Sequence, residues 1–274
     1  MTTSQQTAAT LPAFPRASRV LSTTTFEAYR GITAGIDGWF SIPAVAIWDA
    51  LLSFQAEQSI HGHLFEIGVW EGKSAALMAM HARSGEKLVL ADFELKPKAI
   101  RRALSSAGIG EGVEVIELGG DSRALHMYPI HPECFQKVRW MHIDGQHSAR
   151  AVSSDMALAN QLLAPDGVLV IDDFFSWLYP QVTEAVLRYV RQFPDDFTLF
   201  LCGYNKAYLC RTHFAHRYLE FCAQELPEAL SARGVESTLA KTTYPAEMNT
   251  FGIGPVFQDL TRRGPDWEPD MLRY

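Results

Sequence analysis

The chain has few cysteines and no long apolar run, and both shortages limit what it can be. No apolar stretch approaches the roughly 18 uninterrupted residues of a membrane span. The richest stretch, residues 42–54, is shorter and contains Asp49. The four cysteines among 274 residues form no Cys-x-x-Cys pair. We therefore expect no disulfide framework, no membrane segment, and a reducing, cytoplasmic setting.

Clusters of basic residues are also absent. Lys and Arg number 24 against 31 Asp and Glu, which gives a net charge of −7. Such a surface repels a phosphate backbone, so nucleic acid is a poor candidate partner. The first 26 residues contain no acidic residue and only two basic ones, without the apolar run of a signal peptide. We interpret residues 1–24 as a flexible or partner-bound arm rather than a targeting segment.

From residue 63 onward, short apolar runs alternate with amphipathic stretches. The expected strands cover residues 63–67, 87–92, 113–118, 138–144 and 167–173. Helices are expected between and after them near residues 73–83, 96–107, 122–127, 149–163 and 180–193. This alternation is typical of right-handed βαβ units, and therefore of a three-layer, Rossmann-like α/β fold with a mostly parallel sheet.

An antiparallel strand should complete the sheet. Two β-like runs, 197–202 and 206–211, are separated by three residues, which suffice for a hairpin but not for a parallel crossover. We divide the rest of the chain by composition. Two helices form an N-terminal lead-in or lid (25–60), a core covers 61–212, and a C-terminal extension (213–274) holds a helix at 213–224 followed by irregular, proline-containing sequence. The extension could cover a site or join subunits of a homo-oligomer.

Every expected parallel strand ends in, or is followed by, a carboxylate. Ligands of open α/β sheets bind beyond the carboxyl ends of the strands, where these side chains should gather. They are Glu66, Asp92, Asp121, Asp144, Asp172 and Asp173. Carboxylates stabilise the sulfonium of S-adenosylmethionine and repel the pyrophosphate of a dinucleotide. The acidic edge therefore favours the sulfonium cofactor.

Particular residues suit a nucleoside ligand. Gly68 and Gly72 permit a tight strand-to-helix turn and close approach of a ligand to a helix start, although they lack the Gly-x-Gly-x-x-Gly spacing. Asp92 is placed to accept hydrogen bonds from ribose hydroxyls. Asp121, followed by Ser122, could read an adenine edge or cap the next helix, and both roles can hold together.

The densest acidic cluster comprises Asp144, Asp172 and Asp173. On neighbouring strands these carboxylates would repel one another, which Mg²⁺, Mn²⁺ or Ca²⁺ would relieve. Alternatively, one caps a helix and another faces solvent. His147, three residues after Asp144, could accept a proton from a substrate hydroxyl or be a structural residue at a helix start. His142, inside a strand, is expected to be a satisfied core residue.

These motifs resemble the class I S-adenosylmethionine-dependent methyltransferases, and within them the macrocin and novobiocin sugar O-methyltransferase family. The resemblance rests on EIGVWEG (66–72), on IDG (143–145) with His147 and Asp155 downstream, and on VIDD (170–173), with DGWFS (37–41) ahead of them. It implies a seven-stranded sheet with an antiparallel final strand. It also implies O-methylation of a hydroxylated small molecule such as a sugar, a phenol or a secondary metabolite, with divalent metal assistance.

The resemblance assigns roles to individual residues. The implied cofactor contacts are Glu66, Gly68, Val69, Trp70, Gly72, Ser74, Asp92, Phe93, Asp121, Ser122 and Asp144. His147 and Asp144 would be catalytic, and Asp144, Asp172 and Asp173 would bind Mg²⁺. One departure concerns Gln146, where the family tends to carry an acidic residue. If that acid is the general base, its role passes here to His147, to the metal alone, or to nothing.

Two other readings remain open from the sequence. A dinucleotide-dependent oxidoreductase shares the sheet and Asp92 but would need the pyrophosphate glycine pattern. A non-catalytic, cofactor-binding subunit would bind the cofactor without transferring a methyl group. A related group that resembles cephalosporin hydroxylases shares the scaffold with different chemistry, so the fold alone does not prove methyl transfer.

Overall fold

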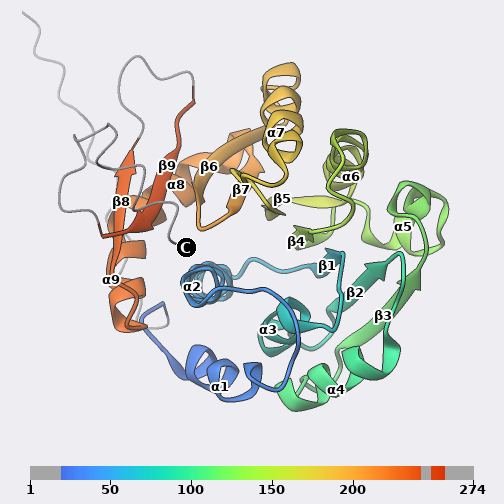
Figure 1. Ribbon diagram of the computed structural model, residues 1–274. Helices are drawn as coiled ribbons and strands as arrows, with labels where there is room; N and C mark the ends of the chain where they lie inside the picture. Colours follow the sequence, from blue (N-terminus) through green and yellow to red (C-terminus); the bar gives the residue numbers. More distant parts are fainter. Residues whose placement is uncertain (1–19, 242–247, 257–274) are drawn as a thin grey trace, which may run out of the picture.

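A twisted nine-stranded sheet forms the centre of the computed structural model, which describes residues 20–241 and 248–256 (Figure 1). The strand order is β3-β2-β1-β4-β5-β7-β6-β9-β8. The bounds are β1 His63–Ile67, β2 Lys87–Asp92, β3 Glu114–Gly119, β4 Val138–Ile143, β5 Leu163–Asp172, β6 Phe197–Gly203, β7 Lys206–Arg211, β8 Ser237–Lys241 and β9 Phe251–Pro255. Strands β1 to β5 are parallel, and β7 runs antiparallel to both of its neighbours, β5 and β6.

Helices cover both faces of the sheet and make three layers (Figure 1). One face carries α1 Thr24–Thr33, α2 Ile42–Glu57, α3 Lys73–His81, α4 Pro97–Ala107, α8 Ala215–Gln224 and α9 Leu226–Ala232. The other carries α5 Ile130–Cys134, α6 Ala149–Leu162 and α7 Pro180–Gln192, with a 3₁₀ helix at Ser122–Met127. A second 3₁₀ turn, Thr212–Phe214, precedes α8. No described helix is long and apolar enough to cross a membrane.

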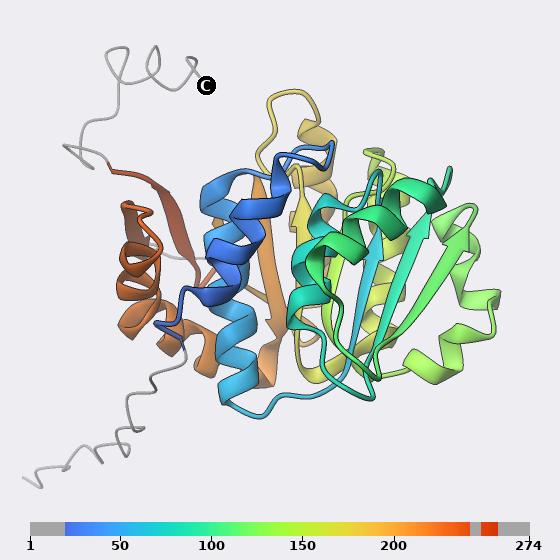
Figure 2. The ribbon, with the colours of Figure 1, turned by 90° about the horizontal axis from the view of Figure 1, so that it is seen from below.

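The central strands are buried on both faces, which explains why their sequences are apolar. Successive residues of β4 and β5 point to opposite faces, so Trp140 joins one hydrophobic core and Met141 the other. Every residue of β4 is buried. Helix α2 begins where the N-cap residue Ser41 accepts a hydrogen bond from the Ala44 amide. Figure 2 shows α1 and α2 lying across one face of the sheet.

The predicted core agrees with the structure, and the differences lie outside it. The antiparallel hairpin is confirmed, with β7 inserted between β5 and β6. The extension is more regular than expected, because α9, β8 and β9 follow the predicted helix and give nine strands where the resemblance implied seven. Strand β9 pairs in parallel with β6. The predicted arm at 1–24 falls outside the described residues up to position 19, as do 242–247 and 257–274 of the extension.

Candidate active site

The turn between β1 and α3 brings two strand ends into close contact. Gly68 has φ +85°, and a Cβ added there would lie 1.9 Å from the Asp144 carbonyl oxygen. Gly72 has φ +86° and is the N-cap of α3. Both glycines therefore have the left-handed conformation that the motif requires. The turn fixes the end of β1 directly against the end of β4.

Asp92, at the end of β2, holds this turn in place. One of its carboxylate oxygens accepts hydrogen bonds from the amides of Val69 and Trp70, at 2.8 and 2.9 Å. The other accepts from the Glu94 amide at 2.9 Å. The predicted contact of Asp92 with a ribose remains a prediction. Phe93, next along the chain, has 75% of its surface exposed, so it is free to contact a ligand.

Glu66, near the carboxyl end of β1, has no exposed surface. Its Oε1 accepts a hydrogen bond from the Ser74 hydroxyl at 2.5 Å and lies 2.7 Å from Nδ1 of His142. Its Oε2 is buried without a hydrogen-bond partner among the described residues. Because an unpaired buried carboxylate oxygen is costly, this atom indicates a ligand that carries a donor or a positive charge.

His142 connects Glu66 to the acidic cluster. Its Nε2 lies 3.5 Å from Oδ2 of Asp172, and its ring packs edge-on against Trp48. Burial acts to lower its pKa, but the carboxylates of Asp172 and Glu66 prevail and raise the pKa to about 9. The residue is buried as predicted. Its link between the two parts of the site was missed, since a strand histidine gives no sequence signal of its partners.

Lys206, the first residue of β7, was not predicted as a site residue. Its side chain is 4% exposed, and its ammonium contacts Oδ2 of Asp172. The other oxygen of Asp172 accepts from the Asp173 amide at 2.8 Å. Burial acts to raise the pKa of Asp172, but Lys206 and His142 hold it below its usual value. No sequence signal marks this lysine, because a lysine after a hairpin turn is usually exposed.

His147 lies between two carboxylates at the mouth of the cluster. Its Nε2 is 3.3 Å from Oδ1 of Asp144 and 3.1 Å from Oδ2 of Asp173. Burial and the charge of Asp172 raise the pKa of Asp144 to about 6, although the hydrogen bond from His147 acts in the opposite direction. The hydrogen bond to Asp144 is the main cause of the raised pKa of His147. All three side chains of this group are partly exposed, so a ligand can reach them.

The three expected metal ligands do not form one group. Potential ligand atoms of Asp144 come within 4.8 Å of His142 and Asp172 in one set, and of His147 and Asp173 in another. Asp172 is poorly placed to bind a metal, because its two oxygens already contact Lys206 and the Asp173 amide. A three-aspartate Mg²⁺ site therefore does not fit the side chains as they are arranged.

Asp121 has the capping role that the sequence left open. It accepts a hydrogen bond from the Arg123 amide at 3.0 Å, and the Arg123 guanidinium holds its pKa at about 2. A contact with adenine remains a prediction. Nearby, Asp155 is 1% exposed and neither of its oxygens has a hydrogen bond of good geometry among the described residues. Burial raises the pKa of Asp155 to about 6, against the influence of the Ser122 hydroxyl.

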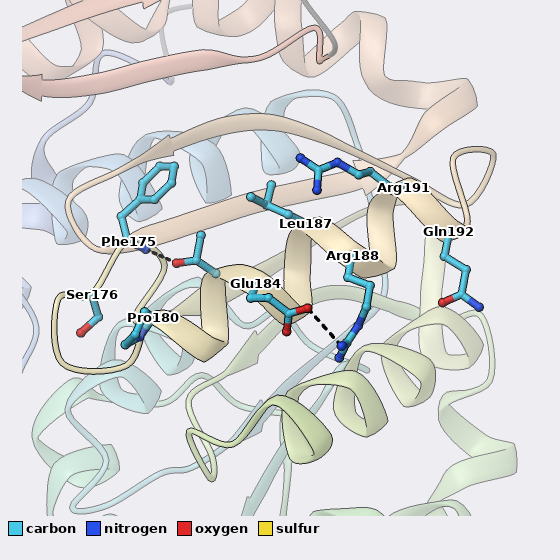
Figure 3. Close-up of a pocket in the computed structure, with 9 residues that line it drawn as sticks. Phe175, Ser176, Pro180, Glu184, Leu187, Arg188, Arg191 and Gln192 are labelled. Atoms are coloured by element: carbon cyan, nitrogen blue, oxygen red, sulfur yellow. Dashed lines mark hydrogen bonds and ion pairs between the residues drawn. The ribbon is translucent and has the colours of Figure 1, made fainter.

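A cavity of about 840 Å³ lies along α7 (Figure 3). It runs along α7 from Phe175 and Ser176 to Arg191 and Gln192. None of the predicted cofactor, metal or catalytic residues lines it. Its lining residues come from α7 and the segment just before it, so we place the candidate site at the strand ends and not in this cavity.

Comparison with known proteins gives a family match over part of the chain. Residues 65–174 match the family model Methyltransf_24, described as a methyltransferase domain. That range contains the glycine turn, Asp92, Asp121, Asp144, His147 and the Asp172–Asp173 pair. No curated protein is similar enough to match.

Solved structures of similar shape include several O-methyltransferases. CalS11, the TDP-rhamnose 3′-O-methyltransferase of calicheamicin biosynthesis, is 14% identical over 69% of this chain and 93% of its own, with a TM-score of 0.48. The O-methyltransferase NovP is 16% identical over 63% and 81%, with a TM-score of 0.46. TomG from Streptomyces achromogenes, solved with S-adenosylmethionine, is 20% identical over 71% and 89%, with a TM-score of 0.46.

At these identities and TM-scores the solved structures carry no argument about substrate or mechanism. What the comparisons show is that residues 65–174 match a methyltransferase domain. The sheet that contains this segment has five parallel strands followed by an antiparallel β7 between β5 and β6.

Proposed function

We propose that the protein transfers the methyl group of S-adenosylmethionine to a hydroxyl oxygen of a small molecule. The observation that carries this proposal is the position of His147, whose Nε2 lies between Asp144 and Asp173 at the edge where the glycine turn ends. An imidazole held this way is suited to accept a proton from an acceptor hydroxyl. The overall net charge of −7 favours a small acceptor over nucleic acid.

The residues around the turn fit the cofactor. The unpaired Oε2 of Glu66 is suited to the cofactor's methionine ammonium, and Gly68 lets the end of β1 pack directly against the Asp144 carbonyl. We assign the ribose to the region of Asp92 and Phe93, and the adenine to Asp121 and Ser122. When bound, S-adenosylmethionine supplies an electrophilic methyl group at the carboxyl edge of the sheet.

His147 would then act on the acceptor. With the proton of the neutral imidazole on Nδ1, its Nε2 would take the hydroxyl proton as the oxygen attacks the methyl carbon and S-adenosylhomocysteine leaves. The new N–H would then donate to Asp144. The two flanking carboxylates stabilise the resulting imidazolium, in agreement with the direction of the His147 pKa shift. General-base catalysis of this kind typically contributes about 10²–10⁴-fold to a rate. Alignment of the reacting atoms supplies the remaining rate enhancement.

A divalent ion, which the sequence led us to expect, would compete with this role. The set of Asp144, His147 and Asp173 is open enough to hold one, and its mixed imidazole and carboxylate donors suit Mn²⁺ better than Mg²⁺. A metal bound there would use the lone pair of the His147 nitrogen that faces the carboxylates. His147 cannot be a metal ligand and a general base through the same atom.

The proposal is tested by ligand-induced thermal stabilisation followed by turnover. S-adenosylmethionine and S-adenosylhomocysteine should each raise the unfolding temperature, with and without Mg²⁺, and NAD(P) should not. A panel of sugars, phenols and other hydroxylated compounds is then screened for S-adenosylhomocysteine release. Stabilisation by NAD(P) alone would make the protein an oxidoreductase candidate, and cofactor binding without turnover on any acceptor would favour a non-catalytic subunit.

A further inference from the structure

The active edge contains a buried ammonium group that the expected chemistry does not use. Lys206 is 3% exposed, and its Nζ contacts Oδ2 of Asp172. The same nitrogen lies 5.3 Å from the ring centroid of Phe40 and 6.0 Å from that of Trp48. Aromatic faces at these distances stabilise a cation electrostatically. Asp172 and the two aromatic rings therefore stabilise the positive charge of Lys206.

We propose that Lys206 is the built-in cation of this site and makes a divalent ion unnecessary for methyl transfer. The inference rests on the proposed function. A metal bound to Asp172 would have to share Oδ2 with the ammonium or displace the Asp173 amide from Oδ1. Two cations on one carboxylate repel each other strongly in a buried site. Lys206 thus excludes a metal from Asp172 by charge as well as by position. At Asp144, His147 and Asp173 a metal would occupy the Nε2 that the proposed general base needs.

The charge balance of the edge supports the same conclusion. The three aspartates of the cluster face three basic side chains, those of Lys206, His142 and His147. His142 approaches Asp172 from the β4 side while Lys206 approaches from β7. The mutual repulsion of the carboxylates, which motivated a metal from sequence, is therefore relieved within the chain. Lys206 is a positioning residue that holds Asp172 ionised and in place.

Direct measurement of Mn²⁺ binding to the full chain tests this proposal. Electron paramagnetic resonance of free Mn²⁺ is followed with wild type, Lys206→Met, and the double variant Lys206→Met with Asp172→Asn. Lys137→Met, which removes an exposed lysine at the start of β4, is the matched control. S-adenosylhomocysteine binding is measured in parallel to confirm that each variant is folded.

Wild type and Lys137→Met should bind no Mn²⁺ below millimolar concentrations, and chelator should leave their turnover unchanged. Lys206→Met should gain one Mn²⁺ with at least a ten-fold increase in affinity, and the double variant should lose it. The idea is overturned by stoichiometric Mn²⁺ on wild type, by chelator-sensitive turnover, or by a folded Lys206→Met without new affinity. The wild-type measurements test the proposal even if Lys206→Met does not fold. Failure of wild type to bind S-adenosylhomocysteine would instead refute the proposed function.

Discussion

Contacts to both the side chain and the backbone of His147 fix its orientation. Its ring packs against Tyr179 with the centroids 4.2 Å apart, and its carbonyl oxygen accepts a hydrogen bond from the Gln181 side chain at 2.6 Å. The two carboxylates then hold its Nε2. A side chain fixed in this way loses little entropy when it takes up a proton, which suits a general base.

Replacement of His147 should separate chemistry from binding. We expect His147→Ala to lower kcat about 10²-fold or more, since general-base catalysis is worth that much, and to leave S-adenosylhomocysteine affinity nearly unchanged. S-adenosylhomocysteine release and calorimetric titration measure the two quantities. His216→Ala, an exposed histidine on α8, is the control. Loss of cofactor affinity equal to the loss of kcat would show that His147 is a binding residue.

Asp155 gives a pH-dependent prediction. Its pKa of about 6 in the folded protein lies above the ordinary aspartate value, so its ionisation opposes folding. Its contribution to stability is complete below pH 4 and is lost as the pH rises through 6. We expect Asp155→Asn to raise the free energy of unfolding by about 2 kcal/mol more at pH 8 than at pH 4. Urea unfolding of the cofactor-free protein measures this, and an effect equal at both pH values would contradict it.

Among the elements, the turn from β1 to α3 depends most on a single residue. A Cβ at Gly68 would overlap the carbonyl of Asp144, so the turn cannot accept any side chain without moving the end of β4. Gly85 offers a comparison, because its φ is +84° but a Cβ there meets nothing within 4 Å. Substitutions at these two positions therefore distinguish the free-energy cost of backbone strain from the cost of steric overlap.

Gly85→Ala should cost only the conformational strain, about 1–2 kcal/mol of unfolding free energy. Gly68→Ala should cost about 2 kcal/mol beyond that, because it adds a steric clash to the strain. It should also abolish S-adenosylhomocysteine binding, which Gly85→Ala should leave intact. Chemical unfolding and calorimetry measure both. Equal destabilisation by the two substitutions, with cofactor binding retained, would show that the turn yields and that the close approach is not needed.

Elements within the core were predictable because local pattern and tertiary environment agree there. The runs at 63–67 and 87–92 are short, mostly apolar strands that are buried within the sheet. Strand β9 was missed because Phe251–Pro255 contains two glycines and a proline, which indicate a loop. It becomes a strand through pairing with β6, where Gly203 lets the two backbones approach.

The acidic residues and His147 could be predicted from the sequence, whereas Lys206 and the contacts of His142 could not. Carboxylates at strand ends follow from the order of elements, so Glu66, Asp144 and Asp172 were found. Whether a carboxylate is paired depends on residues distant in sequence, and the partner of Asp172 comes from β7, 34 positions later. A buried lysine is rare enough that its sequence gives no reason to expect one.

At the scale of the whole molecule, the described part of the C-terminal extension is tied to the N-terminal helices. Arg233, just after α9, forms an ion pair with Asp49 of α2, and both side chains have no exposed surface. Its guanidinium also donates to the carbonyls of Val20 and Ser22. Because these bonds join three distant segments, α9 is part of the same folded unit as the sheet.

Removal of this arginine should destabilise the entire protein. Arg233→Ala leaves the Asp49 carboxylate buried and short of a partner, which typically costs about 3–5 kcal/mol. The expected urea transition is single and shifted to lower concentration. Arg30→Ala breaks an exposed pair with Glu27 and should cost less than about 0.5 kcal/mol. A separate early transition confined to the extension would show that it folds independently.

The central claim is that the carboxyl edge of the sheet binds S-adenosylmethionine, with the buried Glu66 as a necessary contact. Calorimetric titration of the cofactor into wild type and Glu66→Gln tests it most directly. We expect one molecule per wild-type chain and at least ten-fold weaker binding by a folded Glu66→Gln. Unchanged affinity in that variant, or no heat of binding in wild type, would contradict it.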